Sequence, residues 1–488
     1  MSNWVRGTCH VGQMPANGLQ YVPPHPCTCY IEEKLNGFQA LAPASPQGAV
    51  SGQPSAQLVR GPVYGQASNP KPGTQDPKSE WSAFRHDSMR TGAVDTQVPD
   101  GLAPVWRVRV GTKVSAPIVA AGKLFAALTD EHQVVCLDAA DGKQLWAFIA
   151  GGRVDSPPTY HNGTVLFGSA DGWVYCLRAD DGQLVWRFRA APEERLIGAY
   201  GQLESAWPVP GSVLVQEGVA YFVAGRTSEL DGGLYLFGVD AATGETRCHT
   251  RMAGPDYYVN AAGKLAVRPE EGAPPENADA TYDDNFRLPM GSLPDILVGD
   301  GTTLYMRSVA FDGELKRKPG RPDLQVRSGL LDDTYFKRTP WNYDGNYANL
   351  LAHDSNSVYY IRQFDSLQGL SPTVLFTPGS KGYLLFGKNL GGKSNTWMER
   401  VPVRVRAMVL TTGRLFVAGP PDVVDPKDPL GAFEGRKGGL LYAIDCKSGD
   451  RATEYQLPSP PVFNGAAAAN SRLYVVEEDG SVTCLARG

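Results

Sequence analysis

SAPIVAAGKLFAALTDEHQVVCLDAADGKQLWAF begins at Ser115, and SPPTYHNGTVLFGSADGWVYCLRADDGQLVWRF begins at Ser156. The two stretches are copies of one pattern. Equivalent positions lie 40 residues apart, namely Cys136 and Cys176, Asp141 and Asp181, Gly142 and Gly182, and Trp146 and Trp186. Each unit of such a repeat buries its apolar face against its neighbours, so a fixed period of this size predicts a solenoid or a propeller.

Each copy predicts four short antiparallel strands. Its apolar runs are rich in Val, Leu, Phe and Tyr, and they are separated by Ala-Gly, Asn-Gly or Asp-Gly pairs. Such pairs accept the positive φ angles of tight hairpin turns. Four strands in each repeat of about 40 residues make one blade of a β-propeller.

The pattern continues beyond the two clear copies. Gly244 closes VDAATG, Gly449 closes IDCKSG, and Asp479-Gly480 precedes VTCLAR. These features resemble the pyrroloquinoline-quinone-like (PQQ-like) repeat β-propellers, and the resemblance covers most of the chain. The segment GLLDDTYFKRTPWNYDG, from Gly329, is similar to one in a planctomycete-type subgroup of these proteins.

We therefore predict an all-β, eight-bladed propeller of four-stranded antiparallel blades. The last unit, Pro461 to Arg487, lacks a fourth strand, and the segment bearing Trp4 resembles such a strand. Strands near both ends of the chain would therefore pair and close the ring. The alternative is seven blades with an N-terminal appendage. The predicted divisions are terminal strands over 1–42, which complete the last blade and start the first, a Pro/Gly/Ser-rich insertion and leading segment over 43–101, and the remaining blades over 102–488, interrupted by an insertion at about 251–292.

Composition excludes several classes of partner. The chain has 488 residues, of which 42% are hydrophobic, and its 46 basic and 51 acidic residues leave a net charge of −5. This balance shows no nucleic-acid footprint. No apolar run reaches the roughly 18 to 20 residues of a membrane span, and MSNWVRG lacks the apolar core of a signal peptide. We expect a soluble chain. Its compartment stays open between the cytoplasm and, for a piece of a longer precursor with a further domain, the periplasm or exterior.

Eight cysteines fall into two groups. Five lie in blade sequence and are predicted to be small core or turn residues: Cys136, Cys176, Cys248, Cys446 and Cys484. The other three accompany a histidine near the N-terminus, as Cys9, His25, Cys27 and Cys29. A hairpin at Asn17-Gly18 would bring Cys9 beside Cys27. A disulfide, a zinc or copper site and free thiols all remain open for this group.

A second candidate site comprises polar residues just before predicted inner strands, where a propeller lines its axial channel. They are Lys113, Arg153, Asp155, Gln202, Glu204, Arg404 and Arg406. Charges that converge in a funnel form a ligand site, and arginine forks suit carboxylates or sulfates. The plainer interpretation is that positions lining a channel are polar because they are wet.

Two further clusters have less specific patterns. The first is Asp332, Asp333, Tyr335, Lys337, Arg338 and Trp341, close in sequence to His353 and Asp354. Paired carboxylates with an aromatic platform suit acid/base chemistry, although adjacent Asp residues usually form a solvated turn. The second is Arg85, His86, Asp87 and Arg90, which we interpret as a structural clasp that ties the insertion to the ring.

The resemblance also bears on function. Quinone-dependent dehydrogenases of this fold carry a vicinal Cys-Cys pair, and this sequence has none, which argues against bound PQQ. Similar propellers without the quinone include outer-membrane assembly lipoproteins, which are scaffolds that engage partner proteins. We therefore expect a non-catalytic binding or scaffold module for a partner protein or an anionic glycan, without assigning catalytic residues. The alternative is a carbohydrate-active enzyme such as a polysaccharide lyase, but no histidine begins an inner strand to serve as its base.

Overall fold

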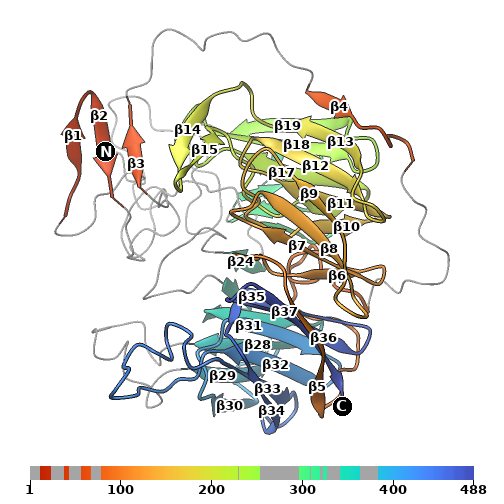
Figure 1. Ribbon diagram of the computed structural model, residues 1–488, viewed down its shortest axis with the longest axis vertical. Coiled ribbons are helices and arrows are strands. Elements are labelled where there is room, and N and C mark those ends of the chain that lie inside the picture. The colour runs from red at the N-terminus through yellow and green to blue at the C-terminus, as the bar shows by residue number, and fades with distance from the viewer. Residues whose placement is uncertain are drawn as a thin grey trace.

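The computed structural model describes residues 11–23, 38–42, 57–66, 79–228, 230–252, 296–307, 309–318, 323–326, 341–362 and 383–488. Over these ranges the protein is all-β, as predicted, and antiparallel sheets follow one another as blades (Figure 1). The described ranges contain no helix, and hence none that is long and apolar enough to cross a membrane.

Seven sheets in the described residues have the form of a blade, with an inner strand and three antiparallel partners stacked outward. The first four blades are β6 (Ile118–Ala120), β7 (Lys123–Leu128), β8 (Gln133–Asp138) and β9 (Gln144–Ile149); β10 (Thr159–His161), β11 (Thr164–Gly168), β12 (Trp173–Arg178) and β13 (Leu184–Arg189); β16 (Leu214–Gln216), β17 (Val219–Ala224), β18 (Leu234–Asp240) and β19 (Thr246–Met252); and β20 (Leu297–Gly299), β21 (Leu304–Met306), β22 (Val309–Phe311) and β23 (Arg317–Lys318). The last three are β27 (Leu350–His353), β28 (Ser357–Arg362), β29 (Leu384–Asn389) and β30 (Trp397–Arg400); β31 (Ala407–Thr411), β32 (Arg414–Gly419), β33 (Gly439–Asp445) and β34 (Arg451–Leu457); and β35 (Pro461–Ala469), β36 (Arg472–Glu477), β37 (Ser481–Arg487) and β5 (Leu102–Arg109).

Four smaller features complete the described strands. They are a sheet of β1 (Met14–Ala16), β2 (Leu19–Val22) and β3 (Gln39–Leu41), a hairpin of β14 (Leu196–Ala199) and β15 (Gln202–Ser205), a sheet of β24 (Leu324–Val326), β25 (Trp341–Tyr343) and β26 (Asn346–Ala348), and β4 (Leu58–Arg60). β4 pairs with β13 as a fifth strand of the second blade. Part of the predicted 43–101 insertion is therefore structured against the ring.

The burial of each strand follows its place in the blade. The second strands are buried almost throughout, as in KLFAAL of β7 and TVLFG of β11, because neighbouring blades cover both of their faces. The fourth strands are partly open to solvent, and in β9 the buried Trp146 stands among exposed residues. The continuous apolar runs of the repeat are thus its middle strands.

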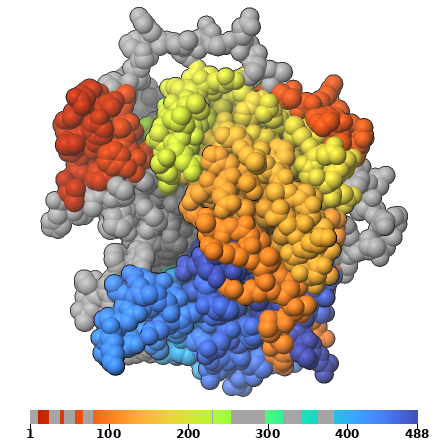
Figure 2. Space-filling view, viewed as in Figure 1, coloured from red at the N-terminus to blue at the C-terminus, as the bar shows by residue number. Residues whose placement is uncertain are grey.

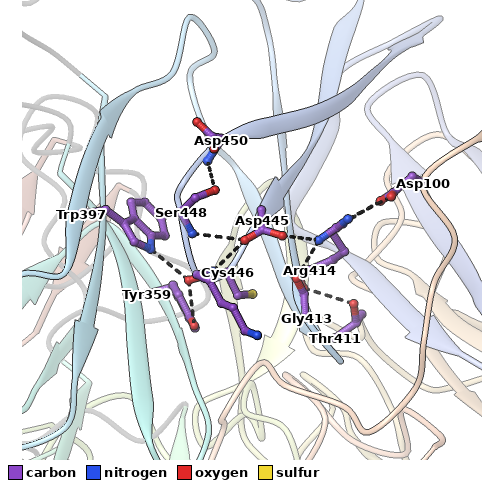
Figure 3. Close-up of polar contacts among 11 residues, drawn as sticks. Asp100, Tyr359, Trp397, Thr411, Gly413, Arg414, Asp445, Cys446, Ser448 and Asp450 are labelled. Carbon is purple, nitrogen blue, oxygen red and sulfur yellow. Dashed lines mark hydrogen bonds and ion pairs between the residues drawn. The ribbon is translucent and has the colours of Figure 1, made fainter.

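A tryptophan on the fourth strand joins each clear blade to the next. Trp106, Trp146, Trp186 and Trp397 donate from Nε1 to the carbonyl oxygens of Ala139, Ala179, Ala241 and Cys446, at 3.2, 3.0, 3.3 and 2.9 Å. Each indole also covers the glycine that ends the same turn of the neighbouring blade. A Cβ on Gly182 would lie 2.7 Å from Trp146, and one on Gly449 would lie 2.7 Å from Trp397. Figure 3 shows the Trp397 contact beside the turn that contains Asp445 and Ser448. This contact recurs once per blade, so it has the same period as the sequence repeat.

The strand that closes the last blade is β5, and the prediction for Trp4 is wrong. β5 pairs with β37 from Ser481↔Arg109 to Arg487↔Leu102, so it fills the fourth-strand position that we assigned to the Trp4 segment. Trp4 itself lies outside the described residues. The two segments resemble each other locally, because a Val-Arg pair follows the tryptophan directly at Trp4 and after one further arginine at Trp106.

An axial segment, residues 79–99, precedes β5 and crosses the centre of the ring. Its backbone accepts hydrogen bonds from the inner strands, or the turns just after them, of six blades: Val119, Tyr160, Gly299, His353, Leu410 and Asn470 are the donors. Ser88 accepts from Gly299 of β20, and Thr91 accepts from His353 of β27, at 2.9 Å in both cases. The segment therefore links the fourth and fifth blades, and we call this region the seam.

The predicted count of eight blades is not confirmed. Around the axis the inner strands make contact in the order β20, β16, β10, β6, β35, β31 and β27, and the axial segment joins the two ends of this series. The sheet β24–β26 lies in the chain between the fourth and fifth blades. In the described residues the sheet β1–β3 pairs only within itself.

The two faces of the ring differ in their connections. One face carries the short turns between first and second strands, such as Ala121-Gly122, Asn162-Gly163 and Asn470-Ser471. The opposite face carries the links from each fourth strand to the next blade, together with the turns between second and third strands. The hairpin β14–β15 and the loop 420–438 between β32 and β33 both belong to it. We call it the insertion face.

Candidate functional site

The hairpin β14–β15 is an insertion between the second and third blades on the insertion face. Its strands pair from Leu196↔Ser205 to Ala199↔Gln202, and Tyr200 and Gly201 form its turn at φ angles of 50° and 75°. Positive φ at both positions is the requirement of a type I′ turn, which suits the twist of a two-residue hairpin. Figures 1 and 2 show the hairpin, in yellow-green, to the left of β17–β19.

Polar contacts fix one face of this hairpin to three blades. Gln202 Oε1 lies 2.7 Å from His132 Nε2 of the first blade. Glu204 pairs with Arg153, in the link to the second blade, at 2.9 Å, and with Arg226 of the third blade at 2.8 Å. Arg195, just before β14, pairs with Asp231 and stacks 4.5 Å from the Trp207 ring. The hairpin is therefore held rigidly against the ring.

The other face of the hairpin is apolar and open to solvent. Side chains alternate between the faces of a strand, so Leu196 and Leu203 share the face opposite Glu204. Leu196 is 63% exposed and Leu203 is 69% exposed. Ile149, at the end of β9 on the same side of the ring, is 68% exposed. Contiguous exposed apolar side chains are a feature of interaction surfaces.

The loop 420–438 is the second described insertion on this face. Ion pairs define its shape, since Asp425 pairs with Lys437 and Asp428 with Arg436. It exposes Val423, Val424 and Leu430. In Figure 2 this loop, in blue, and the hairpin stand out on the same side of the molecule.

Three of the predicted channel residues, Arg153, Asp155 and Glu204, come together at the hairpin, whereas Gln202 contacts His132 instead. Arg153 is 2% exposed, donates to both oxygens of Asp155, pairs with Glu204 and stacks 4.0 Å from the Tyr200 ring. Burial lowers the pKa of Arg153, but its carboxylate partners more than offset this, so the pKa lies above its ordinary value. Burial raises the pKa of Glu204 despite the two arginines. The two arginines and two carboxylates balance, so this network anchors the hairpin without leaving an unpaired charge.

The remaining channel candidates are separate from that network. Arg404, 6% exposed, pairs with Asp422 at 3.3 Å, and Arg406 pairs with Glu478. Lys113 lies 3.7 Å from Asp130 at the surface. Within the described residues no hydrogen bond or ion pair joins Arg404 or Arg406 to the Arg153 network. An anionic ligand would have to compete with an internal carboxylate for each of these cations.

Of the other predicted clusters, one is found in the structure and two lie largely or wholly outside the described residues. Arg85 and Arg90 bond to the ring through carbonyl oxygens, as the clasp interpretation predicts. Trp341 and His353 are buried in the seam, whereas Asp332, Asp333, Tyr335, Lys337 and Arg338 lie outside the described residues. Cys9, His25, Cys27 and Cys29 also lie outside them, so that prediction stands untested. In the described ranges no three His, Cys, Asp or Glu side chains form a metal site.

The five cysteines in blade sequence are unpaired thiols. Cys136, Cys176 and Cys484 are fully buried, and each lies opposite a tryptophan of the fourth strand, namely Trp146, Trp186 and Trp106. Burial raises the pKa of Cys136 and of Cys176 to about 12. Cys248 and Cys446 are partly buried near the turns. These positions are core and turn residues, as predicted.

Leu196 and Leu203 were missed from the sequence. The signal was present, because RLIGAYGQLES places a Tyr-Gly turn between two alternating stretches. The pattern did not indicate exposure, because apolar residues in a strand pattern are normally assigned to the core.

The described residues do not fit a quinone site. The axial segment bonds to six blades across the centre of the ring and places Phe84, Arg85 and Arg90 there as buried side chains. Trp106, Trp146, Trp186 and Trp397 pack on neighbouring turns. The sequence contains no Cys-Cys pair.

Comparison with known proteins agrees with the repeat geometry. Residues 92–272 match the PQQ-like repeat family model described as outer membrane protein assembly factor BamB. The chain is a β-propeller of PQQ-like repeats. A stretch of 70 residues is 39% identical to outer membrane protein assembly factor BamB of Burkholderia pseudomallei, which is 14% of this chain and 18% of that relative.

Solved structures show the same fold. The quinohemoprotein alcohol dehydrogenase of Comamonas testosteroni superposes with a TM-score of 0.53 over 85% of this PQQ-like propeller and 82% of that chain, at 14% identity. At this identity the likeness concerns the fold alone.

Proposed function

We propose that the protein is a non-catalytic binding module that engages a partner protein through its insertion face. The observation that carries this proposal is the rigid hairpin β14–β15, which exposes Leu196 and Leu203 to 63% and 69%. A preformed apolar surface loses little conformational entropy on binding, which favours a protein partner over a sugar. The name of the matching family, an assembly factor, supports a partner of this kind.

An anionic glycan has less support as the ligand. Its carboxylates would need Arg153, Arg404 or Arg406, and each of these already pairs with a carboxylate of the chain. The lyase alternative would need a base near such an arginine, and Tyr200 is the nearest described candidate. Burial raises the pKa of the Tyr200 phenol, which makes it a poorer base at neutral pH.

Site-specific crosslinking tests the proposal. A photoreactive amino acid would replace Leu203 in the native host, and the same residue would replace Met398, which is 55% exposed on β30, as the control. We expect a discrete protein adduct from position 203 and none from position 398. In a separate variant, Leu196→Asp should weaken binding of the identified partner about tenfold or more, because a charge would enter the apolar contact.

Two results would contradict it. One is the absence of any adduct specific to position 203. The other is binding of uronic-acid oligosaccharides by the purified protein that is lost in an Arg404→Ala, Arg406→Ala double variant, which would favour the glycan; unsaturated products would favour the lyase.

A further inference from the structure

The seam between the fourth and fifth blades contains two buried arginines of the axial segment. Arg85 is 3% exposed and Arg90 is fully buried. Arg90 donates from Nε to the Leu297 carbonyl oxygen of β20 at 3.0 Å. Arg85 donates to the carbonyl oxygens of Arg90 and of Leu351 in β27, and to Asn464 Oδ1 at 3.1 Å. The two side chains thus span the blades that the axial segment connects.

These two positive charges are not matched by carboxylates. Within the described part of the chain, no carboxylate lies at ion-pair distance from Arg85 or Arg90, and their acceptors there are neutral oxygens. Burial lowers the pKa of Arg85 to about 9 and that of Arg90 to about 10, which reflects the cost of charging them without water. Buried charges are normally paired.

Asp87 is the described carboxylate whose charge acts on both arginines, and it is already engaged. It accepts from the Thr91 amide at 3.0 Å, from Thr91 Oγ1 at 2.8 Å, and lies 3.3 Å from His86 Nδ1. One negative charge therefore faces two positive ones. The nearby His353 adds no further positive charge, because burial lowers its pKa and favours the neutral imidazole.

Two tightly buried N–H donors, on Arg90 and Trp341, find no hydrogen-bond acceptor among the described residues. Arg90 Nη2 and Trp341 Nε1 are both unsatisfied, in residues that are 0% and 1% exposed. The Trp341 ring lies under the Arg85 guanidinium at 4.4 Å, and Arg85 in turn bonds to the Arg90 carbonyl oxygen. Arg85 therefore contacts both the Trp341 ring and the Arg90 backbone. An unsatisfied buried donor costs free energy that an acceptor would recover.

We propose that the seam is a binding site for one small oxyanion of the carboxylate or phosphate class, held by Arg90 and Trp341. An oxyanion supplies the two things that are missing: a negative charge between Arg85 and Arg90, and several acceptor lone pairs for the guanidinium and indole N–H groups. It would join the fourth and fifth blades through the axial segment, which makes it a structural ligand of the ring. This inference is independent of the insertion face.

Titration of the whole protein with inorganic phosphate tests the proposal. Isothermal titration calorimetry should show one site per chain, and the melting temperature should rise saturably in phosphate compared with sodium chloride at equal ionic strength. Native mass spectrometry of the purified protein detects an anion that is already bound. Uptake of phosphate or a retained anion supports the site. If neither is found, the proposal is wrong.

Two tryptophan variants locate the site. Trp341→Phe keeps the aromatic ring under Arg85 and removes the indole N–H, so the apparent affinity for phosphate should fall about fivefold to tenfold. Trp397→Phe is the matched control, because Trp397 Nε1 already donates to the Cys446 carbonyl oxygen in another blade. Its affinity for phosphate should be unchanged. Equal losses in both variants, or no loss in Trp341→Phe, would overturn the assignment to the seam.

Discussion

Glycines in the turn between third and fourth strands decide how closely neighbouring blades pack. Gly142, Gly182, Gly244 and Gly449 all have positive φ and lie against the tryptophan of the adjacent blade. Two requirements therefore coincide at one position, the left-handed backbone and the absence of a Cβ. The glycine of each Asp-Gly, Thr-Gly or Ser-Gly pair in these turns meets both requirements.

Gly182→Ala should destabilise the protein by about 1 to 2 kcal/mol for the left-handed backbone and by a further ~1 to 3 kcal/mol for the contact with Trp146. Gly122→Ala is the control, because Gly122 has the same φ of 71° and nothing within 4 Å of its Cβ position. Urea unfolding of both variants measures the difference. Equal destabilisation would mean that the tryptophan contact is unimportant.

Buried His353 should make the stability of the protein depend on pH. Burial lowers the pKa of His353 below its ordinary value of 6.5, so the folded protein favours the neutral ring. The unfolded chain takes up the proton first as the pH falls. This stabilisation is therefore complete above about pH 6.5 and is lost below it, by at most about 1.4 kcal/mol per pH unit.

His353→Phe should reduce that loss, because it keeps an aromatic ring on Tyr343, which stacks at 4.0 Å. His249→Phe, on Phe237 at 6.2 Å, is the control at an exposed position and should leave the acid dependence unchanged. The measurement is the free energy of unfolding from pH 7.5 to pH 5. An unaltered slope in His353→Phe would refute the assignment.

At the scale of elements, β5 determines how the ring closes. Beyond its backbone pairing with β37, it supplies Arg107, which donates to both oxygens of Glu477 at 3.2 and 3.3 Å. Glu477 is fully buried and also accepts from the Ser459 amide. The closing strand therefore satisfies a charge inside the last blade.

Arg107→Met should cost about 1 to 3 kcal/mol, because the buried Glu477 loses its cationic partner. Arg109→Met is the control, since Arg109 is exposed two residues further along the same strand. Urea midpoints of the two variants give the comparison. A loss in Arg107→Met no greater than in the control would show that the closure depends on backbone pairing alone.

At the scale of the whole molecule, the axial segment and β5 act together. Residues 79–99 bond to six blades, and Asp100 then binds Arg414, which donates to it from Nε at 2.6 Å and also binds Asp445 (Figure 3). In chain order, the axial segment first bonds to the inner strands of the ring, and β5 then pairs with β37 at its outer edge. The ring is thus tied at its centre and at its rim by one continuous piece of chain.

A chain of residues 79–488 should fold, whereas residues 102–488 should show no cooperative unfolding transition. The first keeps the axial segment, and the second keeps β5 but leaves the fourth and fifth blades without their link. Circular dichroism during heating distinguishes them. A cooperative transition in the shorter chain at an unchanged temperature would contradict this account.

The sequence by itself determined the parts of the protein that repeat. The spacing of Trp146 and Trp186 and the Gly that each next blade presents are local, so the blade and its packing could be predicted. The polarity of the channel residues could also be predicted, because it follows from their local positions just before the inner strands. Their partners could not, because Arg404 and Asp422, or Arg153 and Glu204, meet only when separate connections fold over one face.

Tertiary structure alone decided the remainder. The Trp4 and Trp106 segments have similar local sequences, and only the position of β37 in space selects β5 as its partner. The axial segment has no apolar period, because its hydrogen bonds go to six different strands instead of one regular neighbour. The exposure of Leu203 likewise depends on what the ring leaves uncovered. Periodic contacts are written locally in the sequence, whereas contacts made once between distant segments are fixed only when the ring closes.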